Sequence, residues 1–148
     1  MRTPVQQNEC LIGSEFGKRL VALLDGAERH IEIIMFEWRW YENDPSNPMQ
    51  LVNNALVRAA RRGVAIRCIT HNREIINTLV PLKIKAKKLQ RRGLLHSKLI
   101  LIDDGVAIIG SHNLTSSAMQ SNVETSICIP CKQSAASFKQ FFERLWQS

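Results

Sequence analysis

The sequence predicts a single α/β domain, residues 1–148, in which helices flank a mixed β-sheet on both faces. Three observations support this fold class. A chain of 148 residues has the length of one ordinary domain. Hydrophobic residues make up 45% of it and charged residues 22%, which is typical of a globular protein. Helical and strand-like patterns also alternate along the first half of the chain, and this order favours a sheet covered by helices.

The first half of the chain contains two helix–strand pairs. Apolar residues at helical spacing predict a helix that Ser14 caps and that ends near Gly26. A strand rich in isoleucine and aromatic residues follows, and then turn residues with two prolines. A second amphipathic helix stops at Gly63 and leads into a buried strand. These segments read EFGKRLVALLDGAERH, HIEIIMFEW, YENDPSNP, MQLVNNALVRAARRG and VAIRCIT.

In the second half, residues 72–92 have the least decisive pattern. NREIINTL fits a short helix that starts at Asn72 and is broken by Pro81, whereas LKIKAKKL fits either a strand or more helix. SKLILID and VAIIG then predict two antiparallel strands joined by a tight turn at Asp104-Gly105. SNVETSICIP predicts a last strand, and KQSAASFKQFFERLWQS predicts a closing amphipathic helix.

The net charge of +7 favours an anionic partner, either nucleic acid or an acidic lipid surface. Six basic side chains fall within ten residues, directly before the first strand of the hairpin. They form either a surface that follows phosphates, which we favour, or a solvated edge strand protected by lysines. The predicted substrate-binding residues in this basic run are Lys83, Lys85, Lys87, Lys88, Arg91 and Arg92.

The absence of targeting patterns and the spacing of the cysteines narrow the expected location and the possible kinds of site. The first ten residues are polar and no apolar run approaches about 20 residues, so we expect no signal peptide, no membrane span and a cytoplasmic location. Cys128 and Cys131 form a C-x-x-C pair without a second Cys or His pair at zinc spacing. A zinc or redox site is therefore not favoured.

Polar side chains gather where the predicted hairpin opens. His96 and Lys98 share one strand face because positions i and i+2 point the same way. Ser111 and Asn113 also share parity and follow the second strand, after Gly110, which lets the backbone turn. Antiparallel pairing brings the end of the second strand beside the start of the first. An imidazole, a fixed cation and two neutral hydrogen-bonding groups then meet, a set that suits phosphoryl transfer.

A longer string in this region resembles the signature of the phospholipase D superfamily: His96-x-Lys98-x4-Asp103, followed by Gly110-Ser111-x-Asn113. The surrounding elements, over roughly residues 8 to 147, also resemble the superfamily's single-motif members. These are small bacterial nucleases and the mitochondrial cardiolipin-hydrolase and piRNA-nuclease branch. The resemblance implies a phospholipase D-like fold and, because the chain has one H-x-K motif, a homodimer. Two copies of the motif would form one active site, with the sheets meeting at the two-fold axis.

The resemblance also implies catalytic roles. One His96 would attack phosphorus to form a phosphohistidine, and the partner's His96 would protonate the leaving oxygen and then activate water. The two histidines would titrate as a coupled pair. Lys98 and Asn113 would stabilise the phosphoryl oxygens, with Ser111 assisting.

Two acidic residues have separate expected roles. Glu124 occupies the position of the superfamily glutamate that hydrogen-bonds the nucleophilic histidine, although it also fits a surface strand residue. Asp103 belongs to the motif, but we expect it to brace the hairpin. No metal or other cofactor is implied, because the sequence offers no convincing cluster of carboxylates.

The aromatic run after the first predicted strand leaves two interpretations open. Trp38 and Trp40 share parity and either stack bases or lipid at the rim of the site, or pack in the core or a dimer interface. We expect His112 to be a neighbour of the site, and His30 and His71 to be surface residues.

The favoured function is that of a metal-independent phosphodiesterase, an endonuclease acting on DNA or RNA. The enzyme alternative is a phospholipase D-type hydrolase of an anionic phospholipid such as cardiolipin, which should need an apolar membrane-docking surface. An alternative of another class is a catalytically silent nucleic-acid-binding module. The intact set of His, Lys, Ser, Asn and Glu argues against a silent module.

Overall fold

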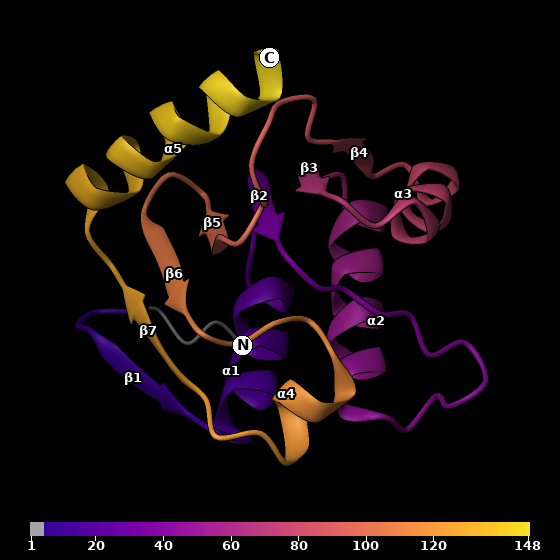
Figure 1. Ribbon diagram of the computed structural model, residues 1–148. Helices are drawn as coiled ribbons and strands as arrows, with labels where there is room; N and C mark the ends of the chain where they lie inside the picture. The colour runs from indigo at the N-terminus through magenta and orange to yellow at the C-terminus, as the bar shows by residue number, and fades with distance from the viewer. Residues whose placement is uncertain (1–4) are drawn as a thin grey trace.

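A seven-stranded mixed sheet forms the centre of the computed structural model, which describes residues 5–148 (Figure 1). The strand order is β1-β7-β6-β5-β2-β3-β4. Strands β2, β3 and β4 run parallel to one another, and the other neighbours are antiparallel. The strands are β1 (Glu9–Ile12), β2 (His30–Met35), β3 (Ala65–Thr70), β4 (Lys85–Lys88), β5 (Lys98–Ile102), β6 (Val106–Gly110) and β7 (Thr125–Ile129).

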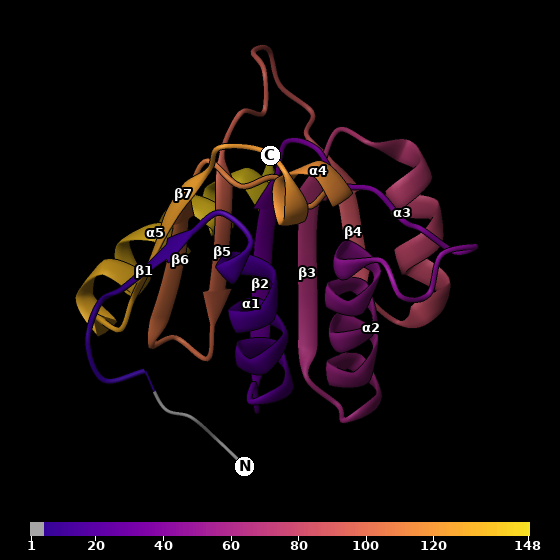
Figure 2. The same cartoon turned by 90° about the horizontal axis from the view of Figure 1, so that it is seen from below.

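Helices cover both faces of the sheet (Figure 2). Helices α1, α2, α3 and α4 pack on one face, and α5 packs on the opposite face. This layered arrangement confirms the predicted α/β class with a mixed sheet between helices. The helices are α1 (Glu15–Asp25), α2 (Pro48–Arg61), α3 (Arg73–Leu79), the 3-10 helix η1 (Val80–Leu82), α4 (Ser116–Gln120) and α5 (Lys132–Gln147).

Strand alternation divides the core into two clusters. Ile31 and Ile33 of β2 face the α1–α2 side, whereas Ile34 faces α5. Phe142 and Leu145 of α5 are buried against that second side, as the apolar face of the predicted closing helix requires. None of the helices in residues 5–148 is long and apolar enough to cross a bilayer.

The helix N-termini differ in their capping. Ser14 precedes α1 as expected, but its side chain makes no capping hydrogen bond. The caps of α2 and α3 are asparagines: Asn47 Oδ1 accepts the N–H of Met49 at 2.9 Å, and Asn72 Oδ1 accepts that of Glu74 at 3.0 Å. A side-chain oxygen at this position satisfies an N–H group that has no partner inside the helix.

Several element boundaries depart from expectation. The undecided segment LKIKAKKL contains η1's last residue and edge strand β4, so the strand interpretation is the correct one. Lysines on such an edge discourage pairing with other chains. The short elements β1 and α4 were not predicted. Strand β2 ends at Met35, earlier than the aromatic run suggests, so the chain leaves the sheet before the tryptophans.

The β5–β6 turn lies one residue earlier than predicted. Its central residues are Asp103 and Asp104, with φ of 52° and 59°, and the N–H of Gly105 bonds to the carbonyl of Ile102 at 3.2 Å. Two successive residues with positive φ match the twist of a hairpin, and aspartate tolerates this conformation better than most residues.

One end of the sheet collects several strand ends. Strand register places Met35 level with Thr70, Lys88 and Lys98. Leu99 pairs with Ile109, so the next residue of β6, Gly110, lies level with Lys98. We call this the upper end, because it lies at the top of Figure 2. Since β2 and β3 lie between β4 and β5, residues 89–97 must pass over both strand ends. This segment, which we call the crossing, projects at the top of Figure 2.

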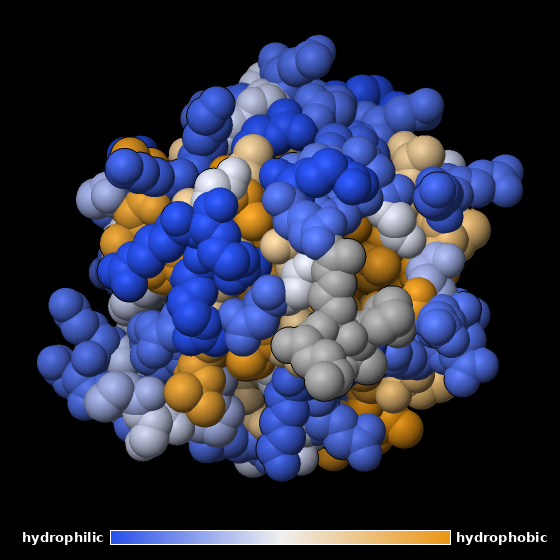
Figure 3. Space-filling model, turned by 180° about the vertical axis from the view of Figure 1, so that it is seen from behind, coloured by the Kyte–Doolittle hydropathy of each residue, from blue (hydrophilic) through white to orange (hydrophobic). Residues whose placement is uncertain are grey.

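The side of the molecule seen from behind Figure 1 is mainly hydrophilic. Hydrophobic residues show there in separate patches (Figure 3). This is the distribution expected for a solvent-exposed side of a small domain, since scattered apolar residues are normal on protein surfaces.

Candidate active site

His96 and Lys98 lie in contact at the upper end of the sheet. Lys98 Nζ is 3.4 Å and 3.5 Å from the two ring nitrogens of His96 and donates to its backbone carbonyl at 2.9 Å. The His96 ring is exposed, so a substrate can reach it. The motif therefore presents an imidazole and an ammonium group side by side, as expected, although β5 begins only at Lys98 and His96 precedes the strand.

An aromatic ring supports this pair. The ring of Phe36 lies 4.9 Å from that of His96 between centroids, and Lys98 Nζ lies 5.2 Å from the Phe36 centroid. A ring face in this position attracts the cation and packs against the imidazole. Phe36 was missed from sequence, although it follows Met35, whose backbone pairs with Lys98.

Asn113 is oriented by the backbone of the neighbouring loop. Its Oδ1 accepts the N–H of Glu37 at 3.1 Å. This bond leaves the two N–H donors of its amide without a hydrogen-bond partner among the described residues. Asn113 can therefore offer donors to an anion at this end of the sheet.

Ser111 and Glu124 form a second pair at the same end. Ser111 Oγ donates to Glu124 Oε1 at 2.8 Å and accepts the N–H of Thr125 at 3.0 Å, while Asn122 Nδ2 donates to Glu124 Oε2 at 3.3 Å. Within residues 5–148, Glu124 makes no hydrogen bond to His96 of the same chain. A carboxylate has room for further donors beyond these two.

The glycine of the motif is required by space. Gly110 remains in β6, opposite Ser126 of β7. A Cβ at this position would lie 2.1 Å from Ser126 Oγ and 2.3 Å from Ser126 Cα. Gly110 is also the last residue of β6 and has a φ of 157°, a conformation that L side chains rarely adopt. Glycine therefore serves both the end of the strand, as expected, and the close approach of two strands beside the site.

His112 is buried next to the site and has a structural role. Its Nδ1 is 2.7 Å from Ser126 Oγ, its Nε2 is 2.9 Å from the carbonyl of Gly13, and its ring stacks on Phe16. Burial lowers the pKa of His112, which favours the neutral ring. With both nitrogens occupied, His112 is not placed to react with a substrate.

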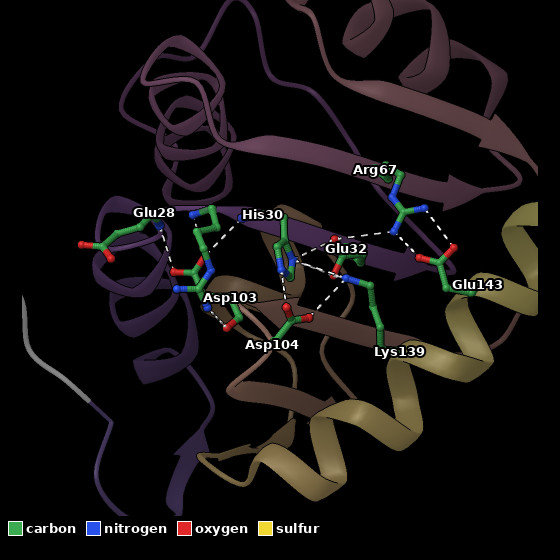
Figure 4. Close-up of polar contacts among 9 residues, drawn as sticks. Glu28, His30, Glu32, Arg67, Asp103, Asp104, Lys139 and Glu143 are labelled. Atoms are coloured by element: carbon green, nitrogen blue, oxygen red, sulfur yellow. Dashed lines mark hydrogen bonds and ion pairs between the residues drawn. The ribbon is translucent and has the colours of Figure 1, made fainter.

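Asp103 lies at the other end of β5 from Lys98 and is not brought to the site. Its carboxylate accepts the backbone N–H groups of Glu28, Arg29 and His30 at 2.9, 2.7 and 3.1 Å (Figure 4). These bonds fix the hairpin turn to the start of β2. Although Asp103 is part of the motif, its contacts are those of a brace.

The structure divides the basic run. Lys83 and Lys85 lie further from the upper end, because Lys85 begins β4 and pairs with Arg67, three residues before Thr70 at the upper end of β3. Lys87 Nζ donates to the carbonyls of Trp146 and Ser148 and so binds the end of α5. The members at the upper end are Lys88, at the end of β4, and the exposed Arg91 and Arg92 of the crossing.

The two tryptophans have different environments. Trp38 is 1% exposed and its Nε1 donates to Asn53 Oδ1 at 2.9 Å, so the core interpretation is correct and base stacking by this ring is excluded. Trp40 is half-buried and lines a surface pocket with Asn72 and Thr78 beside α3.

A polar cluster that sequence reasoning missed lies at the lower end, under α5 (Figure 4). Buried Glu32 accepts Lys139 Nζ at 2.9 Å and lies 3.2 Å from His30 Nδ1, and His30 Nε2 lies 2.7 Å from Asp104. Although His30, Glu32 and Asp104 are close enough to share an ion, the Lys139 ammonium already supplies the positive charge. The cluster ties α5 to the sheet. The sequence pattern that could have indicated it is the i, i+2 pair His30 and Glu32, which share one strand face.

The C-x-x-C pair also has a structural environment. Cys128 is buried in β7, and burial raises the pKa of its thiol to about 11. Cys131 Sγ accepts the N–H of Ser134 at 3.5 Å as the cap of α5, and this contact lowers its pKa. Both thiols are free.

Comparison with known proteins agrees with this geometry. The family described as "Cardiolipin synthase, PLD-like domain" matches residues 20–146. Mitochondrial cardiolipin hydrolase from Xenopus laevis is 30% identical over 154 residues, which cover 98% of this chain and 69% of that protein. Two solved structures share the fold. NucT from Helicobacter pylori has a TM-score of 0.82 and 17% identity, with 96% of each chain covered. Nuc from Salmonella typhimurium has a TM-score of 0.79 and 21% identity, with 95% of each chain covered. The chain therefore belongs to the phospholipase D superfamily of hydrolases.

Proposed function

We propose that this protein is a metal-independent phosphodiesterase that cleaves nucleic acid at an active site shared by two copies of the chain. The observation that carries the proposal is the grouping of His96, Lys98 and Asn113 at one end of the sheet. An exposed imidazole next to an ammonium group, near free amide donors, suits attack on a phosphodiester and stabilisation of its charged oxygens.

The chemistry calls for a second imidazole. In the first step a nitrogen of one His96 forms a bond to phosphorus, the P–O bond to the leaving group breaks, and the partner's His96 gives that oxygen a proton. In the second step the partner's His96 takes a proton from water, whose oxygen displaces the first histidine. One chain supplies one His96, which supports a two-fold dimer with one site.

The polar groups around His96 support separate roles in this scheme. Lys98 and Asn113 would bind the non-bridging oxygens. Glu124 is held by Ser111 and Asn122, with no bond to His96 of its own chain, which supports a role in orienting the partner's His96. Ser111 would then act through Glu124, because its hydroxyl proton is already donated to that carboxylate.

Charge at the upper end supports nucleic acid as the substrate. Lys88, Arg91 and Arg92 lie at the same end as His96, and the chain carries a net charge of +7. Cations near the reacting centre can bind phosphates on either side of the scissile bond.

An anionic phospholipid is the second candidate, and a specific observation favours it. Three large hydrophobic residues are exposed at the upper end: Ile12 by 59%, Leu94 by 67% and Val123 by 100%. Exposed apolar residues next to arginines are what docking on an acidic bilayer requires. Relatives named mitochondrial cardiolipin hydrolase also point to this substrate class.

A substrate panel in excess EDTA tests the proposal and separates the candidates. Labelled single- and double-stranded DNA, RNA and cardiolipin vesicles are incubated with the wild type and with His96→Asn. We expect nucleic-acid cleavage by the wild type alone, with binding retained by the variant. Release of phosphatidic acid from vesicles without nucleic-acid cleavage would favour the lipid candidate. Binding of nucleic acid with no cleavage of any substrate would support the silent module.

A further inference from the structure

The crossing that delivers His96 is anchored at two buried leucines. Leu89 and Leu95 are 8% and 4% exposed, whereas the residues between them are exposed. We call these exposed residues, 90–94, the tip of the crossing, and Leu94 in it is 67% exposed. Burial of these two leucines holds both ends of the exposed segment. Because the residues between them make few buried contacts, the backbone of the segment needs a further contact to fix its position.

A histidine outside the motif adds a directed contact to this backbone. His71 Nε2 accepts the N–H of Leu95 at 3.0 Å. Leu95 is the residue directly before His96, so the bonded peptide group is one residue from the reacting imidazole. Among the described residues, two side chains from outside the crossing hydrogen-bond the backbone of residues 89–96, and these are His71 and Lys98.

His71 is itself held in place. It follows Thr70, the last residue of β3, and precedes Asn72, the cap of α3. The N–H of Asn72 bonds to Thr70 Oγ1 at 3.2 Å, and Asn72 Nδ2 donates to the carbonyl of Trp38 at 2.9 Å. The imidazole that reaches the crossing therefore starts from a rigid strand end.

The contact also fixes the protonation state that His71 needs. A ring nitrogen accepts a hydrogen bond through its lone pair, so Nε2 must carry no proton and the neutral ring carries it on Nδ1. The imidazolium form has no acceptor and would face the N–H of Leu95 with another N–H. A leucine or phenylalanine at position 71 could fill the space but could not make the bond.

We propose that His71 is a positioning residue: it holds the Leu95–His96 backbone so that the His96 imidazole stays aligned with Phe36 and Lys98 for attack on phosphorus. This inference deepens the proposed function and rests on it. It replaces the expectation that His71 is an ordinary surface residue.

Two substitutions separate the hydrogen bond from the bulk of the ring. His71→Leu removes the acceptor, whereas His71→Gln keeps one, because Gln Oε1 can occupy the place of Nε2. Gln90→Leu is the matched control, since Gln90 is an exposed residue of the same crossing whose side chain makes no hydrogen bond among the described residues. Misplacing a reacting group by about 1 Å costs roughly 100-fold in rate. We therefore expect His71→Leu to lower kcat by about 10- to 100-fold with KM changed less than about threefold.

Rescue decides whether the effect is one of position. His71→Gln should recover kcat to within about threefold of the wild type, and Gln90→Leu should match the wild type. A wild-type kcat for His71→Leu would overturn the proposal. Equal losses in His71→Leu and His71→Gln, with melting temperatures unchanged, would overturn it as well.

Limited trypsin digestion tests the tether without any activity. Trypsin cuts after Arg91 and Arg92 in the exposed tip. Loss of the tether should speed cleavage at these bonds several-fold in His71→Leu but not in His71→Gln or Gln90→Leu, and equal rates would contradict the tether. If the wild type cleaves no substrate in the panel, the proposed function fails and the positioning role fails with it. The digestion then reports only whether the structural contact exists.

Discussion

Gly110 allows a quantitative test of how the site is built. In Gly110→Ala the new Cβ would lie 2.3 Å from Ser126 Cα, whereas carbon atoms in ordinary contact are about 3.5 Å apart or more. The deficit is about 1 Å, and since Ser126 Cα is backbone, no rotamer change can relieve it. Strands β6 and β7 must separate.

Overpacking of this kind costs about 1 to 3 kcal/mol, and a backbone clash belongs at the upper end of that range. For a chain of 148 residues, each kcal/mol lowers the melting temperature by about 2–4 °C. We therefore expect a drop of about 6–12 °C for Gly110→Ala. The strand shift also moves Ser111 and its bond to Glu124, so kcat should fall as well.

Thermal unfolding followed by circular dichroism gives the measurement, and Gly26→Ala is the matched control. A Cβ at Gly26, with φ of −88°, would meet its nearest neighbours at 3.5 Å and 3.6 Å, which is ordinary contact. Alanine there should be neutral or stabilise by up to about 1 kcal/mol. A melting temperature for Gly110→Ala within 2 °C of the wild type, or an equal loss in both variants, would refute the reasoning.

Three further substitutions test other parts of the account. Asp103→Ala removes three backbone hydrogen bonds at the lower end and should destabilise by roughly 2 kcal/mol while kcat stays within about twofold, so a large loss of kcat in the folded variant would give Asp103 a catalytic role. Phe36→Leu removes the ring that contacts His96 and Lys98 and should lower kcat about tenfold at nearly constant melting temperature, and an unchanged kcat would show that the ring is dispensable. Burial lowers the pKa of His112, so the unfolded chain binds this proton more readily as the pH falls through about 6.5, and acid costs stability. Urea unfolding at pH 8 and pH 5 should show a larger acid loss for the wild type than for His112→Gln, and parallel losses would contradict the buried neutral ring.

The sequence predicted the fold best where the apolar pattern of a segment agreed with the turn and capping residues at its ends. The nearly continuous apolar runs HIEIIM and KLILI predict strands in the sheet interior. The i, i+2 spacing predicts that His96 and Lys98 lie together, which they do, although β5 begins only at Lys98. Strand–strand register alone brings Gly110 level with Lys98, so one end of the sheet was predictable from two strands and a turn.

What the sequence could not predict depended on long-range contacts. Trp38 reads as either rim or core, and only the distant Asn53 decides for the core. Lys87 looks identical to its basic neighbours, yet α5 places two carbonyl groups where they bind its ammonium. The contact of His71 with Leu95 spans 24 residues and follows no short motif. Such contacts depend on how the elements pack, which local periodicity does not encode.

In the proposed dimer, one active site needs His96 from two chains, and subunit mixing tests this requirement most directly. Wild-type and His96→Asn chains are combined at known fractions under conditions that exchange subunits, and cleavage in EDTA is measured at constant total protein. If both histidines are required, mixed dimers are inactive and activity follows the square of the wild-type fraction. Activity that falls in direct proportion to the wild-type fraction would contradict the shared site.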